Sequence, residues 1–341
     1  MTTRVAIRFA ASLTLALAFA PRAECAETDQ FLTWDIELED CSGPLNNYFN
    51  REIEVVLHKL NERKKPVTDP VEVIEAIYLH VFEGLHSSRV REFLNTSPDI
   101  DVYPPRDVAM DEYRKMSIYN RPLFPYIFPM ARTVRVGDVY CGIDKIGHFF
   151  GFGRRYFWRY ARVRAQGMED VEAAEHLLRV GMQQELSLVG MLVDGILSYG
   201  DLEANYMGFE LAKDLVHESD AFVQRDGNGW RLVQAVDLRD YVTPNFDESY
   251  NVSRYWARRK KFVLPRLAEL YCDRAETAIV RARFARYGEH RPSFFMDWLE
   301  EYLDARGRDP REEQALEVLC DGQRDTELAA LDSQAQGQRV E

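Results

Sequence analysis

Several polar residues that could carry chemistry lie within one apolar stretch of the chain, between Cys141 and Leu215. Asp144 and His148 are four residues apart, and this spacing places both side chains on the same face of a helix. A carboxylate beside an imidazole can orient a general base, ligate a metal ion, or form a purely structural hydrogen bond. Lys145 could instead hold an anionic group of a substrate together with His148. The spacing alone leaves these alternatives open.

Glu185 interrupts an apolar stripe that includes Leu178 and Met182 at helical spacing. A carboxylate in that register is either buried or lines a cleft. Burying an unpaired charge is unfavourable by several kcal/mol, so the side chain must be paired, bind a metal or be protonated. Such groups make good general acids. The alternative is a structural ion pair with Arg155 or Arg159.

A second polar series follows, with intervals of four, three, four and three residues between Asp194, Ser198, Asp201, Asn205 and Gly208. If one helix continues through the series, these residues form a polar stripe along an apolar element, and the glycine allows close approach of another helix. Alternatively, Gly200 ends one helix and Asp201 caps the next.

These patterns give two groups of candidate site residues. The expected catalytic residues are His148, Glu185 and Asp144. The expected substrate-binding residues are Lys145, Ser198, Asp201 and Asn205. The sequence identifies no cofactor, although Asp144 and His148 could join Glu185 or Asp201 around Zn²⁺ or Mn²⁺.

Other motifs contribute little or are missing. Asp247 and Glu248 are adjacent carboxylates in a polar and aromatic loop, where such pairs are usually solvated; the less favoured alternative is that they reach the site. The chain contains no G-x-S-x-G, Walker, G-x-G-x-x-G or H-E-x-x-H motif. The common serine-hydrolase, nucleotide-binding and zincin sites are therefore excluded.

Two hypotheses of function follow from these residues. The first is a hydrolase acting on a cell-envelope component such as peptidoglycan, glycan or lipid. Glu185 would be its acid/base, and His148, oriented by Asp144, its second proton-transfer group. The alternative is a non-enzymatic envelope protein, in which the polar residues form a buried structural network and the acidic surface binds a partner.

The hydrophobic periodicity predicts a mainly α fold: one helical domain over residues 26–322, built around three central helices and including a small β-hairpin. The central helices are expected at about 144–164, 169–198 and 201–218. Further helices are expected at 43–63, from Asp69-Pro70 onward, and at 253–274, 293–305 and 310–320. Asp226-Gly-Asn-Gly229 predicts the hairpin turn. Short strands are expected at 31–36 and 132–136, an irregular apolar cover over 97–139, and a disordered tail over 323–341.

The N-terminus predicts export to the periplasm or the exterior. Arg4 and Arg8 precede an apolar run over residues 9–20, which is typical of a signal peptide ending at Cys25. Lipidation of Cys25 is the less favoured alternative, because Glu24 is a poor neighbour for it. The run is too short to span a bilayer, and no later run is long enough.

Four cysteines remain after this cleavage, and an even number in an exported chain predicts two disulfides. We favour Cys272–Cys320 and Cys41–Cys141 as the pairs. The formal charge of −13 argues against nucleic acid or anionic lipid as the main partner.

Three segments together resemble a family of exported bacterial proteins of unknown function. They are Asp144-Lys-Ile-Gly-His148-Phe-Phe, Ser198-Tyr-Gly-Asp201-Leu-Glu-Ala-Asn205-Tyr-Met-Gly208-Phe and Asp247-Glu-Ser-Tyr-Asn251. The resemblance covers roughly residues 120–255. The shorter D-K-x-x-H-F motif is also similar to one in VanZ-like membrane proteins and in a small bacterial lipoprotein family. Neither resemblance implies a known reaction, so both support the position of the site only.

Overall fold

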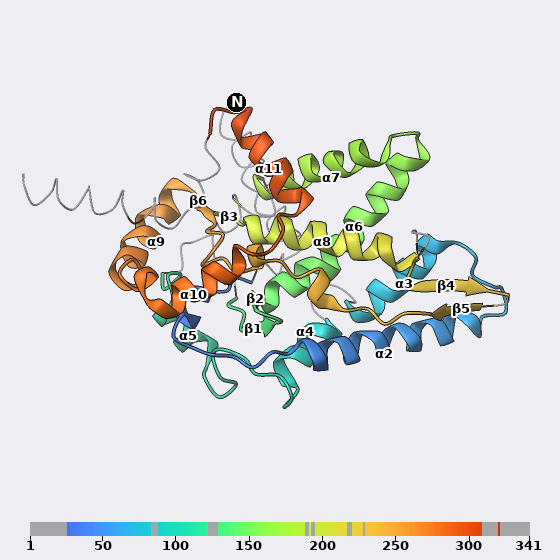
Figure 1. Ribbon diagram of the computed structural model, residues 1–341, viewed down its shortest axis with the longest axis horizontal. Coiled ribbons are helices and arrows are strands. Elements are labelled where there is room, and N and C mark those ends of the chain that lie inside the picture. Colours follow the sequence, from blue (N-terminus) through green and yellow to red (C-terminus); the bar gives the residue numbers. More distant parts are fainter. Residues whose placement is uncertain are drawn as a thin grey trace, which may run out of the picture.

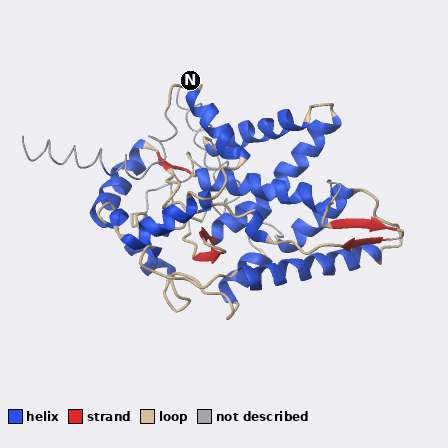
Figure 2. Cartoon of the chain, viewed as in Figure 1, coloured by secondary structure: helices blue, strands red, loops and turns tan. Residues whose placement is uncertain are grey.

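The computed structural model describes residues 26–82, 88–121, 129–187, 191, 195–216, 220–227, 229–308 and 320. The predicted signal peptide, disordered tail and residue Asp194 lie outside these ranges. Helices dominate the described chain, and its strands form small two-stranded antiparallel sheets (Figure 2). The prediction of a mainly α fold with a small hairpin is confirmed.

The described helices are α2 (Ser42–Asn61), α3 (Pro70–Val81), α4 (Arg89–Thr96), α5 (Met110–Met116), α6 (Ile143–Ala165), α7 (Asp170–Glu185), α8 (Tyr199–Val216), α9 (Ala257–Leu270), α10 (Ala278–Tyr287) and α11 (Phe294–Asp304). The strands pair as β1 (Thr133–Val136) with β2 (Val139–Gly142), β3 (Ile196–Leu197) with β6 (Arg254–Tyr255), and β4 (Val223–Asp226) with β5 (Gly229–Leu232). None of the helices in these ranges has the length and apolar character needed to cross a bilayer.

Helices α6 and α8 pack directly against each other at the centre of the molecule (Figure 1). Glycines allow this close packing: a Cβ added at Gly153 would lie 2.6 Å from the backbone carbonyl carbon of Gly208. A Cβ added at Gly208 would in turn collide with the backbone of Phe149. The predicted role of Gly208 in close helix approach is confirmed, and the packing brings the first turns of α6 and α8 together.

The β1–β2 hairpin fixes the start of α6. β2 ends at Gly142 and α6 begins at the next residue, so Asp144 and Lys145 lie in the first helical turn. A second hairpin, β4–β5, lies along the long helix α2 (Figure 1), and Asn61 of that helix donates to the carbonyl oxygen of Trp230 at 2.8 Å. Both strand predictions, at 132–136 and around the Asp226 turn, are confirmed.

Several predicted boundaries are wrong. The second central helix ends at Glu185 rather than at residue 198, and Ile196–Leu197 instead form a strand with Arg254–Tyr255. The same pairing delays the start of α9 to Ala257. Residues 31–36 contain a 3-10 helix, Gln30–Thr33, in place of a strand. The expected irregular cover contains α5, and α4 and α10 were not predicted. These errors involve short elements, whose hydrophobic period is too brief to read.

The disulfide prediction is half correct. Cys272 and Cys320 form a disulfide with a Cα–Cα distance of 5.6 Å. The predicted Cys41–Cys141 bond is wrong, since both are free, buried thiols. Burial raises the pKa of Cys41 to about 12, and Cys141 Sγ donates to its neighbour's carbonyl oxygen. Both are therefore held as unreactive thiols.

Candidate functional site

The side chain of Lys145 lies at the centre of a buried ionic cluster. Its Nζ lies 2.7 Å from Asp144 Oδ2, 2.7 Å from Asp201 Oδ1 and 2.8 Å from Glu248 Oε1. Burial alone would lower the pKa of Lys145, but the three carboxylates outweigh it and raise the pKa well above its usual range. The ammonium donates a hydrogen bond to Asp144 and forms ion pairs with Asp201 and Glu248. Its side chain has no exposed area, so Lys145 orients these carboxylates, and its predicted role in binding a substrate stays a prediction.

Asp144 also differs from its predicted role. Its carboxylate accepts hydrogen bonds from Lys145 and from the hydroxyl of Thr28, and makes no hydrogen bond to His148. Burial opposes ionisation, yet Lys145 and Thr28 together lower the pKa of Asp144 below its ordinary value. The expected Asp144–His148 pair therefore does not form, although both residues lie on the first two turns of α6.

Residues of α8 orient His148. Its Nδ1 lies 3.2 Å from Asn205 Oδ1, and its Nε2 lies 3.4 Å from Asp201 Oδ2. An amide oxygen accepts, so Nδ1 carries a proton in this arrangement. Nε2 then faces a carboxylate oxygen, and a cation could lie between the two atoms. The ring is stacked on Phe152, with 5.1 Å between centroids.

Glu185, on α7, lies close to His148 and Asp201. It is the last residue of that helix and is buried, as its position in the apolar stripe predicted. One ligand atom each from His148, Glu185 and Asp201 lies within 4.8 Å of the other two. Imidazole and carboxylate ligands of this kind suit Zn²⁺ and Mn²⁺. Asn205, behind the imidazole, occupies the outer position that commonly fixes a metal-binding histidine.

The cluster holds more negative than positive charge. Four buried carboxylates, Asp144, Glu185, Asp201 and Glu248, surround Lys145 and His148. Carboxylates gathered away from water need a compensating charge or a proton. A divalent cation or a retained proton can supply it. Burial raises the pKa of Glu248, and Asp201 and Asp144 raise it further against Lys145.

The start of α8 decides whether one helix continues through the polar series that includes Ser198 and Asp201. Ser198 Oγ accepts from the backbone N–H of Asp201 at 3.0 Å and so caps a new helix. The two helices are separate, but both predicted boundary residues are wrong: the earlier helix ends at Glu185, and Gly200 and Asp201 lie in the first turn of α8, which Ser198 caps. Asp201, Asn205 and Gly208 still share the face of α8 that meets α6. The hydroxyl of Ser198 donates to Glu248 Oε1 at 2.5 Å, so this predicted substrate ligand is also engaged internally.

Asp247 and Glu248 were expected to be solvated, and this prediction is wrong. Both are buried. Glu248 joins Lys145, while Asp247 accepts hydrogen bonds from Ser249 and Tyr287. The density of polar residues between aromatic ones over 247–251 was the available signal, and a loop with so many hydrogen-bonding groups can be buried only if they are paired.

Comparison of the chain with protein-family models, with curated proteins and with solved structures gives no match. The resemblances stated from the sequence stay predictions.

Every member of the cluster is buried. Lys145 and Asp144 have no exposed side-chain area. The residues that could bind a metal, His148, Glu185 and Asp201, are also buried, with 3 to 5% exposure each.

Proposed function

We propose that this chain is an exported, metal-dependent hydrolase whose divalent cation is held by His148, Glu185 and Asp201. One observation supports this function above others: three buried ligand atoms from three different helices lie within 4.8 Å of one another. Ligands bound to one ion at about 2.0–2.2 Å lie roughly 3–4.4 Å apart. Small side-chain shifts would therefore bring all three onto one ion.

Each residue of the chain has a defined task in this proposal. Asn205 holds the proton of His148 on Nδ1 and so directs the Nε2 lone pair towards the cation. Lys145 neutralises and fixes Asp201 through Oδ1, which leaves Oδ2 for the cation. Glu185 would hold the cation through one oxygen, and its second oxygen would be placed to take a proton from water as a general base. A bound divalent cation lowers the pKa of water and polarises the bond that is cleaved.

The cell-envelope substrate is supported by compartment alone. The predicted signal peptide places the chain outside the cytoplasm, and the Cys272–Cys320 disulfide is compatible with an oxidising environment. A hydrolase there meets peptidoglycan, glycans and lipids.

Metal analysis and a hydrolysis assay test this function together. We expect about one equivalent of Zn²⁺ or Mn²⁺ in the dialysed protein, and loss of that metal from His148→Ala and Asp201→Asn. Isolated envelope fractions should be hydrolysed by the metal-loaded protein, and EDTA should abolish the reaction until metal is restored. A protein that binds no metal and gains no thermal stability from added metals would contradict the proposal.

The fully enclosed Lys145 favours a second candidate function. An ammonium bonded to three buried carboxylates also suits a non-enzymatic envelope protein in which the network fixes one packing of α6 and α8. Such a protein would keep its stability without metal and would show no hydrolysis.

A further inference from the structure

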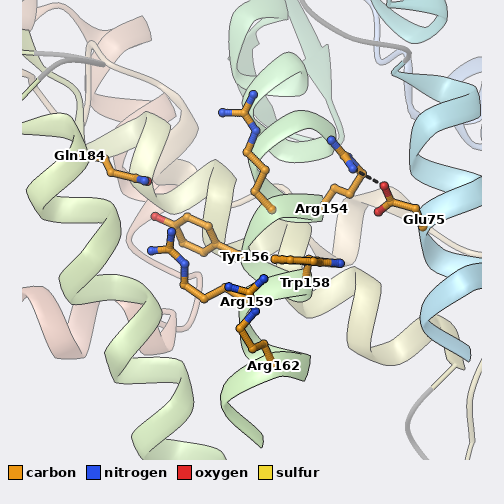
Figure 3. A pocket seen from close by; sticks show the side chains of 8 residues that line it. Glu75, Arg154, Tyr156, Trp158, Arg159, Arg162 and Gln184 are labelled. Carbon is orange, nitrogen blue, oxygen red and sulfur yellow. Dashed lines mark hydrogen bonds and ion pairs between the residues drawn. The ribbon is translucent and has the colours of Figure 1, made fainter. Parts of the chain in front are cut away.

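A basic pocket opens on the far part of α6, beyond the ionic cluster (Figure 3). Its volume is about 460 Å³, and it is lined by residues of α3, α6 and α7. Four arginines of α6 contribute to it: Arg154, Arg155, Arg159 and Arg162. The chain as a whole has a formal charge of −13, so this pocket is a local concentration of positive charge in an acidic protein.

Most of this charge is not neutralised by the chain. Arg154 forms an ion pair with Glu75, which is the carboxylate that lines the pocket. Within the described part of the chain, no carboxylate lies within 4.0 Å of the guanidinium groups of Arg155, Arg159 or Arg162. Like charges held this close repel one another, and an anion bound among them would relieve that repulsion.

The donor geometry selects the kind of anion. A guanidinium presents a planar fork of N–H groups that matches the oxygens of a phosphate, and several forks around one cavity can share its oxygens. Trp158 adds an apolar wall: its side chain is 50% exposed, and the guanidinium of Arg162 lies 4.1 Å from the ring centre. We propose that this pocket binds the phosphate group of an anionic ligand whose uncharged part packs against Trp158.

The pocket lies next to the ionic cluster along the same helix. His148 stacks on Phe152, and the guanidinium of Arg155 lies over the same ring at 4.6 Å. Seven residues of helix separate His148 from Arg155, a rise of about 10 Å. A phosphate held at Arg155 would thus place the rest of its ligand within reach of the cluster.

Tyr156 of α6 and Gln184 of α7 lie between the pocket and the ionic cluster. Tyr156 lines the pocket, and its hydroxyl lies against Gly181 of α7. Burial raises the pKa of Tyr156, and the nearby Glu185 raises it further. Gln184, which precedes Glu185, points towards the pocket from α7 (Figure 3). The pocket's use as a substrate subsite rests on the proposed function, whereas phosphate binding itself does not.

Binding measurements on the full mature chain test this inference. Glycerol 3-phosphate is the soluble probe, and vesicles of phosphatidylglycerol, beside vesicles of phosphatidylcholine, are the lipid probe. The pocket variant is Arg159→Gln with Arg162→Gln. Its matched control is Arg225→Gln with Arg231→Gln, which removes two exposed arginines from the β4–β5 hairpin. We expect the pocket variant to bind at least about tenfold more weakly and the control to bind as the wild type does.

The source of the phosphate follows from the same experiment. Tight binding to phosphatidylglycerol vesicles with weak binding of glycerol 3-phosphate identifies a lipid headgroup as the ligand. If the protein binds glycerol 3-phosphate as tightly as it binds phosphatidylglycerol vesicles, the ligand is a soluble phosphoester. Both results support the pocket, provided that the arginine substitutions abolish the binding.

Other results would overturn it. Wild-type protein that binds neither probe contradicts the inference, and so does equal weakening in the hairpin control, which indicates only a general effect of charge. Repeating the titration in EDTA separates it from the metal proposal, since pocket binding should persist without metal. Binding that disappears in EDTA and is unchanged by the arginine substitutions would place the phosphate at the cluster and refute the pocket.

Discussion

The ammonium of Lys145 and the carboxylate of Glu248 lie 2.8 Å apart, with both side chains buried. One comes from the first turn of α6 and the other from a loop that precedes β6. Ser198 and Ser253 also donate to the same carboxylate oxygen of Glu248. This contact connects the central helices to the C-terminal part of the chain. The residues beside the candidate metal ligands therefore also hold two parts of the fold together.

Replacing Lys145 should therefore destabilise the whole protein. Lys145→Met leaves Asp144, Asp201 and Glu248 buried without their cation, which we expect to lower the free energy of unfolding by about 3–5 kcal/mol. Denaturant unfolding measures this loss. Lys260→Met, at an exposed position of α9, is the matched control and should change stability by less than about 0.5 kcal/mol. A Lys145→Met variant as stable as this control would show that the network does not hold the fold.

Glu185→Gln distinguishes a metal ligand from a structural ion. If Glu185 is a ligand, the substitution should weaken metal binding by at least about tenfold and abolish hydrolysis, while the melting temperature in EDTA stays near that of the wild type. If Glu185 balances a buried cationic group, the same change should lower stability by about 3–5 kcal/mol even without metal. Melting curves with EDTA and with added Zn²⁺ separate these outcomes, and a large loss in EDTA would contradict the enzyme proposal.

Gly208→Ala should disrupt the contact between α6 and α8. The new methyl group would collide with the backbone of Phe149, which cannot rotate away as a side chain could. We expect a loss of about 1–3 kcal/mol or more, together with weaker metal binding, because the same contact positions His148 beside Asn205. Gly43→Ala in α2 is the control: a Cβ there meets nothing within 4 Å, and alanine favours the helix by about 0.5–1 kcal/mol. Equal effects at the two positions would refute the packing argument.

The pH dependence of stability should reflect Glu203. Burial raises the pKa of Glu203 from 4.5 to about 7, against hydrogen bonds from Ser293 and Thr243. The folded pKa lies above the unfolded one, so the folded state holds the extra proton between these values and stability falls as the pH rises. The contribution is fully present below about pH 4.5 and is lost as the pH rises through about 7. Its size is on the order of 3 kcal/mol.

Glu203→Gln should flatten this dependence, because the amide cannot ionise. Denaturant unfolding of both proteins in EDTA at about pH 5 and about pH 8 makes the comparison. We expect the wild type to lose more stability than the variant over that interval. Asp29, whose pKa burial also raises to about 7, should maintain part of the slope in the variant. Identical slopes in the two proteins would contradict the assignment to Glu203.

The sequence by itself determined the features that depend on local period and chemistry. Apolar spacing predicted α2, α3 and α6, and turn residues predicted the β4–β5 hairpin. The position of Glu185 within an apolar stripe correctly indicated a buried carboxylate. A single residue type in a periodic pattern suffices for such inferences, because helical geometry alone decides which side chains share a face.

Only the tertiary structure decided which residues the inward-facing side chains contact. The predicted second helix ends at Glu185, and Ile196 instead pairs with Tyr255 in a two-stranded sheet. Asn205 and Asp201, rather than Asp144, became the partners of His148, and Glu248 arrived from a loop that the spacing of its neighbours could not place. Periodicity specifies that a side chain points inward, whereas its partner depends on long-range packing of α6 against α8. That packing depends on the contact between Gly153 and Gly208. The same packing brings together both the ionic cluster and the candidate metal ligands.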